Sequence, residues 1–319
     1  MLHLLVDSAA VTLCIQKRLK THNNLLIYVF FLYLCSRAEL HPTRIKMKAK
    51  RILFVTQEIT PFVPETYLSK LSRTLSQATQ EAGAEVRIFT PKWGTINIRR
   101  NQLHEVIRLS GMNLIIDDTD HPLIIRVASL QSARSIQVYF IENDDYFQNR
   151  LMTRDEQGVE YPDNDERAIF FARGVLEAVK KQSWCPDLLH CHGWISALVP
   201  LYIKSAYKDE PSFRDAKVIF SLHDDEFNYS TPLPEGFLRK VLHKDMSAEL
   251  LANITEPTTY EDLAKLAIQY CDGVVESSDN INPTLIEYAQ SLGKPVLPKQ
   301  PDEDHNNACI DFYKKFLEA

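Results

Sequence analysis

The chain has 319 residues, of which 45% are hydrophobic and 24% charged, as in ordinary soluble globular proteins with one large or two small domains. A net charge of -6 and the lack of a long Lys/Arg block exclude the basic face that nucleic-acid binding needs. Only nine glycines occur, and they are widely spaced, which excludes the Gly-rich phosphate loops of dinucleotide-binding and P-loop proteins.

Residues 1–46 are predicted to lie outside the fold. Their apolar run, Leu25–Cys35, has about eleven residues and is too short to cross a bilayer as a helix, so no membrane anchor is expected. No small-x-small cleavage site follows the run, which argues against a secretory signal. Met47 leads directly into the first strand. We therefore expect residues 1–46 to be a non-native or disordered extension and residues 47–319 to form the domain.

The domain begins with a predicted strand, helix and strand. Arg51–Thr56 is a continuous apolar and β-branched run, typical of a strand buried on both faces. A helix that ends at Gly83 follows, because apolar residues repeat at three- and four-residue steps: Leu68, Leu71, Leu75 and Ala78. Glu85–Thr90 is the next predicted strand. The two strands of such a unit must be parallel, with a right-handed crossover.

The rest of the chain alternates between strands and helices, apart from one insertion. Strand-like runs from about Leu103 to Ile141 have no helix between them, which predicts antiparallel hairpins. Asp163 and Glu166 are spaced as a capping box for a helix to about Lys180. Later strands are predicted at 187–190, 217–222, 273–276 and 296–297, with helices near 194–207, 261–270, 283–292 and 307–317. This order predicts an α/β fold with a doubly wound, mostly parallel, Rossmann-like sheet.

Ligands of such a sheet bind beyond the carboxyl ends of its strands, where four polar loops are expected. They begin at residues 57, 161, 190 and 223. No metal site is expected among them, because adjacent residues of His190-Cys191-His192 point to opposite faces of a strand. The six cysteines are scattered without the spacing of a zinc site or a disulfide framework, which favours a reducing cytoplasm.

Four segments carry a family resemblance when they are taken together and in order. They are Glu58-Ile59-Thr60-Pro61-Phe62, then Asp163-Asn164 with Arg167 and Phe170-Phe171, then 186–202 around His190-Cys191-His192-Gly193-Trp194, and lastly Lys217–His223. Over most of Met47–Phe227 the chain resembles the starch synthase catalytic domain, family 5 of the glycosyltransferases, which has the GT-B fold. The resemblance implies that this chain supplies one half of a GT-B fold, the amino-terminal half on the acceptor side.

The resemblance also implies an activity and a set of site residues. The activity is extension of an α-1,4-glucan such as glycogen from ADP-glucose or UDP-glucose, without a cofactor. His192 and Asp163 correspond to catalytic positions, whereas Glu58, Asn164, His223 and Asp224 correspond to substrate-binding positions. Each has a structural alternative: a buried histidine, a helix cap, a loop anchor or a solvated carboxylate. His190 and Trp194 are expected to pack in the core.

The departures from the family pattern put catalysis in doubt. Where the family has Lys-Thr-Gly-Gly-Leu against the donor diphosphate, this chain has Pro64-Glu65-Thr66-Tyr67-Leu68. Gly193 replaces an aspartate, and Asp224 replaces an asparagine. Nothing after His223 resembles the donor-binding carboxy-terminal domain, so we expect little or no glucose transfer by this chain alone.

Three alternatives to a complete glucosyltransferase therefore stay open. The chain could be a non-catalytic glucan-binding or regulatory subunit. It could be the acceptor half of a split synthase whose donor domain is a separate chain. A third alternative is a generic doubly wound binding domain that shares only the architecture.

Overall fold

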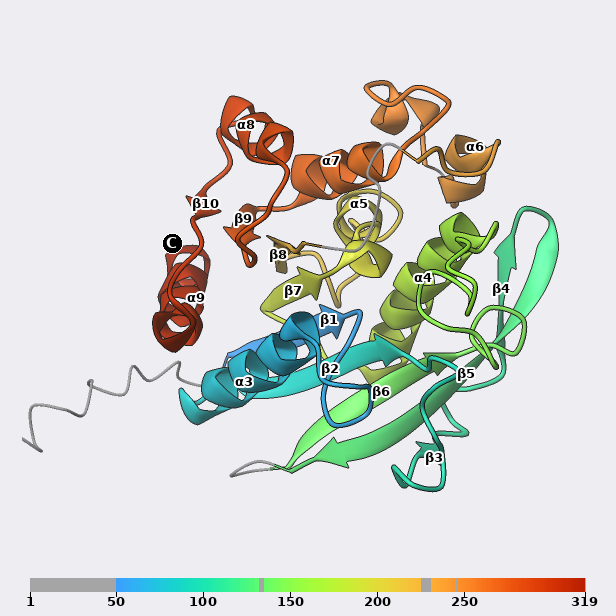
Figure 1. Ribbon diagram of the computed structural model, residues 1–319, viewed down its shortest axis with the longest axis horizontal. Coiled ribbons are helices and arrows are strands. Elements are labelled where there is room, and N and C mark those ends of the chain that lie inside the picture. The colour runs from blue at the N-terminus through green and yellow to red at the C-terminus, as the bar shows by residue number, and fades with distance from the viewer. Residues whose placement is uncertain (1–49, 132–134, 225–230, 245, 319) are drawn as a thin grey trace, which may run out of the picture. The chain divides into compact units, whose positions relative to one another are not determined.

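The computed structural model describes residues 50–131, 135–224, 231–244 and 246–318. The expectation for residues 1–46 therefore lies outside the described residues. Within the described part, the strands form a ten-stranded sheet in the order β10-β9-β8-β7-β1-β2-β6-β5-β3, with β4 paired to β5 (Figure 1). The strands are β1 Arg51–Thr56, β2 Glu85–Pro91, β3 His104–Glu105, β4 Met112–Ile116, β5 Thr119–Leu130, β6 Ile136–Glu142, β7 Leu188–His192, β8 Lys217–Leu222, β9 Gly273–Glu276 and β10 Val296–Leu297.

The strands from β10 to β6 are parallel, and the remaining pairs are antiparallel. Parallel pairing joins β1 to both β2 and β7, and continues through β8, β9 and β10 on one side and β6 on the other. The pairs β3–β5, β4–β5 and β5–β6 are antiparallel. The predicted fold class, a mostly parallel sheet with an antiparallel insertion, is confirmed.

Helices cover both faces of the sheet, as a doubly wound topology requires. In Figure 1, α3 and α9 pack together on one face, and α4, α5 and α7 lie on the other. The α-helices are α3 Tyr67–Glu81, α4 Asn164–Gln182, α5 Val199–Lys204, α6 Phe237–Val241, α7 Tyr260–Tyr270, α8 Pro283–Ser291 and α9 Asp302–Leu317; η2 Trp194–Ser196 and η3 Ala248–Leu251 are 3-10 turns. In the described part of the chain, every helix is too short or too polar to span a bilayer.

The chain reverses its winding direction at β1. It leaves β1 toward β2, and after the insertion it returns through α4 to β7 on the other side of β1. The two loops that follow β1 and β7 start side by side, because the amide of Gln57 donates a hydrogen bond to the carbonyl of His192 at 3.1 Å. In open α/β sheets this switch point is the usual place for a ligand.

Two helical predictions need correction, and two short helical elements were not predicted. The single helix expected at 194–207 is a 3-10 turn followed by the short α5, because Pro200 lacks the amide that would continue a helix from the preceding turn. The last helix begins at Asp302, earlier than residue 307, directly after Pro301. Between residues 231 and 259, where no element was predicted, the structure has α6 and η3.

Candidate functional site

A pocket of about 770 Å³ opens at the carboxyl ends of β1, β8 and β9. Two of the four loops expected from the sequence line it, the loop after β1 and the loop after β8, whereas the loops that begin at residues 161 and 190 do not; the start of α3 is a third wall. The residues before α4 form a fourth wall, and the loops after β9 and β10 complete it. The lining residues are Gln57, Glu58, Thr66, Tyr67, Leu68, Leu151, Met152, Thr153, Arg154, Asp155, Glu156, Gly158, His223, Asp224, Ser278, Asp279, Asn280 and Lys299.

Glu58 lines the pocket beside the N-terminus of α3. Its Oε2 accepts a hydrogen bond from the Thr66 hydroxyl at 2.5 Å, and its Oε1 accepts one from the Gln57 side-chain amide at 3.2 Å. Thr66 is the N-cap of α3 and forms a capping box with Ser69. The positive end of the helix dipole favours a carboxylate at this place. The structure thus brings Glu58 into the pocket as an ordered hydrogen-bond acceptor.

His223 lines the pocket, and the buried His192 is hydrogen-bonded to it. His192 is the last residue of β7 and is fully buried, so it does not line the pocket; its Nδ1 lies 3.2 Å from Nε2 of His223. Its ring also stacks on Phe54. Burial lowers the pKa of His223 to about 3 and that of His192 well below its ordinary value. Both imidazoles are therefore neutral near pH 7, and one donates to the other.

His190 lies in the core, as predicted. Its Nδ1 is 2.6 Å from the Tyr313 hydroxyl of α9, and its Nε2 is 2.7 Å from the Ser221 hydroxyl of β8. Trp194 is also buried, as expected. Among the residues that the structure describes, no group of three or more His, Cys, Asp or Glu side chains is arranged to hold a metal ion.

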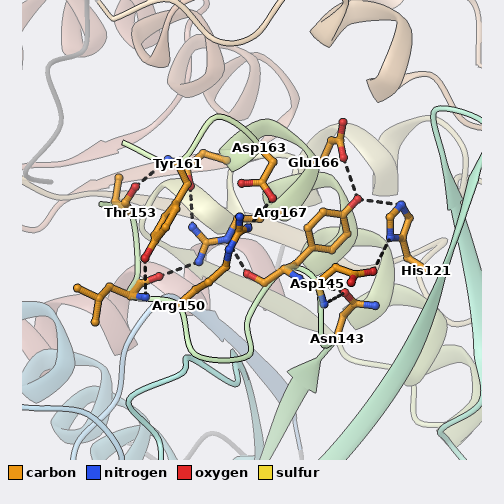
Figure 2. A network of polar contacts seen from close by, with 12 residues as sticks. His121, Asn143, Asp145, Arg150, Thr153, Tyr161, Asp163, Glu166 and Arg167 are labelled. Carbon is orange, nitrogen blue, oxygen red and sulfur yellow. Dashed lines mark hydrogen bonds and ion pairs between the residues drawn. The ribbon is translucent and has the colours of Figure 1, made fainter. Parts of the chain in front are cut away.

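Asp163 and Asn164 do not line the pocket but contact Arg150 and Thr153, beside and within one of its walls; Figure 2 shows Asp163 in this network. The predicted capping box is wrong, because Asp163 makes no side-chain cap and instead pairs with Arg150 at 2.5 Å. Its predicted partner Glu166 accepts hydrogen bonds from Lys240 and Tyr146. Asn164 is buried, and its amide donates to the carbonyl of Thr153 at 3.0 Å.

Gly193 and Gln57 fit together at the switch point. Gly193 has φ +79° and ψ 164°, a backbone conformation that is almost confined to glycine. A Cβ at this position would lie 2.6 Å from Oε1 and 2.8 Å from Cβ of Gln57. The Gln57 side chain thus fills the space that a side chain at residue 193 would enter. Sequence reasoning named Gln57 only as the start of a loop, because the contact joins residues far apart in the chain.

At the start of α3, Thr66 and Tyr67 carry side chains where the starch synthase pattern has two glycines. The Tyr67 hydroxyl donates to Asp302 Oδ1 at 2.9 Å, and Lys299 Nζ lies 3.0 Å from the same oxygen. The pocket lining carries more carboxylates than cations. Its two cations are each paired with a carboxylate outside the lining, Arg154 with Glu160 and Lys299 with Asp302, so the lining is acidic. The carboxylates in the lining are Glu58, Asp155, Glu156, Asp224 and Asp279.

The chain is similar in sequence to known synthases of storage glucans. A family model described as starch synthase catalytic domain matches residues 51–293. A glycogen synthase of Pelodictyon phaeoclathratiforme is 36% identical over 201 residues, which cover 63% of this chain and 40% of the relative. A glycogen synthase of Chlorobaculum tepidum is 32% identical over 239 residues, which cover 74% of this chain and 47% of the relative. The chain thus spans less than half the length of these relatives.

One solved structure supports the fold. The catalytic domain of starch synthase IV from Arabidopsis thaliana, bound to ADP and acarbose, superimposes with a TM-score of 0.63 at 17% identity. The match covers 81% of this chain and 53% of that one.

Proposed function

Because the chain belongs to the starch synthase catalytic domain family, we propose that it binds an α-1,4-glucan as the acceptor-side domain of a glycogen or starch synthase-type glucosyltransferase. The observation that carries the proposal is the pocket at the switch point, lined by Glu58, His223 and Asp224. Residues 47–319 would form this domain, and the groups that grip the nucleotide-sugar would come from a second domain or a separate chain.

The chemistry of these three side chains suits sugar hydroxyls, which donate and accept hydrogen bonds. The carboxylates of Glu58 and Asp224 accept, whereas the neutral imidazole of His223, whose Nε2 is bonded to His192, donates or accepts through Nδ1 according to its tautomer. His192 then has an indirect role, because its hydrogen bond to His223 selects the tautomer that faces the sugar. Asp163 and Asn164 act through the wall that they hold.

A second candidate, a non-catalytic glucan-binding subunit, is supported by the start of α3. The N-terminus of a helix binds phosphate through its free amides, but here Thr66 and Ser69 already cap the helix. The Tyr67 ring occupies a place where glycine would let a diphosphate approach the backbone. The carboxylates of the lining would also repel an anionic donor. These features favour an uncharged oligosaccharide over a nucleotide-sugar.

Titration with maltoheptaose, followed by isothermal calorimetry and by amide chemical shifts, tests glucan binding. We expect the shifts to centre on Glu58, His223 and Asp224, and Glu58→Gln to weaken binding. Glu65→Gln is the matched control, because Glu65 is exposed in the neighbouring loop outside the pocket lining, and its carboxylate lies 3.6 Å from Lys70 Nζ. Shifts confined to the antiparallel insertion, or no binding at all, would refute the proposal.

A transfer assay separates the two candidates. Glycogen is incubated with labelled ADP-glucose or UDP-glucose, with the pure chain alone and with cell extract added. We expect incorporation by the pure chain to stay at background, because loss of even one preorganised group commonly costs about a hundredfold in rate. Turnover by the pure chain would exclude the non-catalytic candidate. Turnover only with extract would indicate a donor domain on a separate chain.

A further inference from the structure

One wall of the pocket is a small hairpin, residues 151–161, which we call the wall hairpin. Arg154 and Glu160 form an isolated antiparallel bridge, and the amide of Tyr161 donates to the carbonyl of Thr153 at 3.1 Å. The carboxylate of Asp155 closes the tip by accepting from two backbone amides at 2.8 and 2.9 Å. The tip is therefore fixed by its own contacts, whereas the position of the whole hairpin depends on what holds its base.

The base of the wall hairpin rests on the guanidinium of Arg167, in the first turns of α4 (Figure 2). Nη2 donates to the carbonyl of Leu151 at 2.8 Å, and Nη1 donates to Oδ1 of Asn164 at 2.7 Å. The amide of Asn164 in turn donates to the carbonyl of Thr153. Nε donates to the carbonyl of Tyr146 at 2.9 Å, so the guanidinium ties the start of α4 to the segments that precede it.

Aromatic rings hold the same guanidinium in place. Its centre lies 4.9 Å from the Tyr161 ring and 5.2 Å from the Trp93 ring. The Tyr161 hydroxyl accepts a hydrogen bond from the amide of Leu151 at 3.1 Å, which ties the two ends of the hairpin together. Arg167 has no exposed surface and does not line the pocket, so it cannot touch a ligand there.

We propose that Arg167 is a positioning residue for glucan binding, because its planar fork holds the wall hairpin against the pocket. The inference rests on the proposed function, since it concerns the affinity of the same pocket. Burial lowers the pKa of Arg167 to about 10, which leaves the guanidinium charged at neutral pH and its hydrogen bonds charge-assisted. A lysine would keep the charge but could not make three bonds in one plane or lie flat on Tyr161.

The test compares Arg167→Lys with Arg173→Lys in the full chain. Arg173 is a matched control on the same helix: it is also buried, but its Nη1 donates to the carbonyl of Ile115 in β4, away from the pocket. Maltoheptaose affinity is measured by calorimetry at a temperature where both variants are fully folded, so a loss of global stability alone does not change it. We expect about tenfold weaker binding for Arg167→Lys and a change within about twofold for Arg173→Lys.

Hydrogen exchange supplies a readout that needs no glucan. The amides of Asp155 and Tyr161, bonded within the wall hairpin, should exchange about tenfold faster in Arg167→Lys and at the original rate in Arg173→Lys. If the original chain fails to bind maltoheptaose, the proposed function fails, while exchange still decides whether Arg167 positions the hairpin. Unchanged exchange and affinity in Arg167→Lys would overturn the inference.

A second variant covers the case in which Arg167→Lys does not fold. Tyr161→Phe removes only the hydroxyl bond to Leu151 and keeps the ring beside the guanidinium. We expect about threefold weaker binding together with faster exchange in the hairpin. Full affinity and unchanged exchange in Tyr161→Phe would count against the proposal in the same way.

Discussion

Substitution of Gly193 by alanine should destabilise the chain by about 2–6 kcal/mol, from two separate causes. The first is backbone strain: φ +79° with ψ 164° is a nearly glycine-only conformation, which costs other residues about 1–3 kcal/mol. The second is overpacking, because the new Cβ would lie 2.8 Å from Cβ of Gln57. The Gln57 amide can rotate away, but its Cβ cannot, so the backbone must shift at about 1–3 kcal/mol.

Urea unfolding followed by tryptophan fluorescence measures this loss, and Gly111→Ala is the control. Gly111 has φ +80°, but an added Cβ there would meet no atom within 4 Å, so this variant should show strain alone, about 1–2 kcal/mol. In the double variant Gln57→Gly/Gly193→Ala, the overpacking should be relieved. Its loss of stability should therefore be smaller than the sum of the two single losses by a coupling energy of about 1–3 kcal/mol. Equal losses for Gly193→Ala and Gly111→Ala, with no coupling, would refute the reasoning.

Three further outcomes are expected. The free energy of unfolding should fall as pH drops from 6.5 toward 3, because burial lowers the pKa of His223 to about 3 and of His305 to about 4, and the unfolded chain then binds protons that the folded chain excludes. Urea titrations across this range should give a shallower slope of unfolding free energy against pH for His305→Gln, and an unchanged slope would contradict this. Lys240→Met should lower the free energy of unfolding by about 3–5 kcal/mol in the same assay, because Lys240 Nζ lies 3.0 Å from the fully buried side chain of Asp165 and its loss leaves that carboxylate without this partner. A loss below about 1 kcal/mol would mean that solvent screens the pair. A chain that begins at Met47 should keep the urea midpoint of the full chain, and a lower midpoint would give residues 1–46 a structural role.

The central strands were predictable because burial on both faces leaves an unbroken apolar run. Arg51–Thr56 and Lys217–Leu222 have the bounds that the sequence indicated. Helix lengths were harder, because local breaks compete with apolar periodicity. Pro200 divides what reads as one helix after Trp194, and the periodic pattern alone does not weigh its missing amide against the apolar face.

The candidate site was predictable only where a residue directly follows a strand. Glu58 and His223 line the pocket for this reason, whereas His192 does not, because β7 runs on to include it and hydrogen-bonds it into the sheet. The capping box failed because distant partners outcompete a local one. Asp163 binds Arg150, and Glu166 binds Lys240, which lies 74 residues further along the chain. Spacing rules for a single helix cannot anticipate such pairs.

The central place of β1 has a consequence for synthesis on the ribosome. One edge of β1 pairs with β2 soon after it is made, but the other edge waits for β7: the amide of Arg51 bonds a carboxylate 136 residues away. At about 5–20 residues per second, that edge stays open for on the order of ten seconds. During this time the open edge of an apolar strand presents unpaired amides and carbonyls that other nascent chains could join. The nascent chain therefore has more need of a chaperone before β7 emerges than after it.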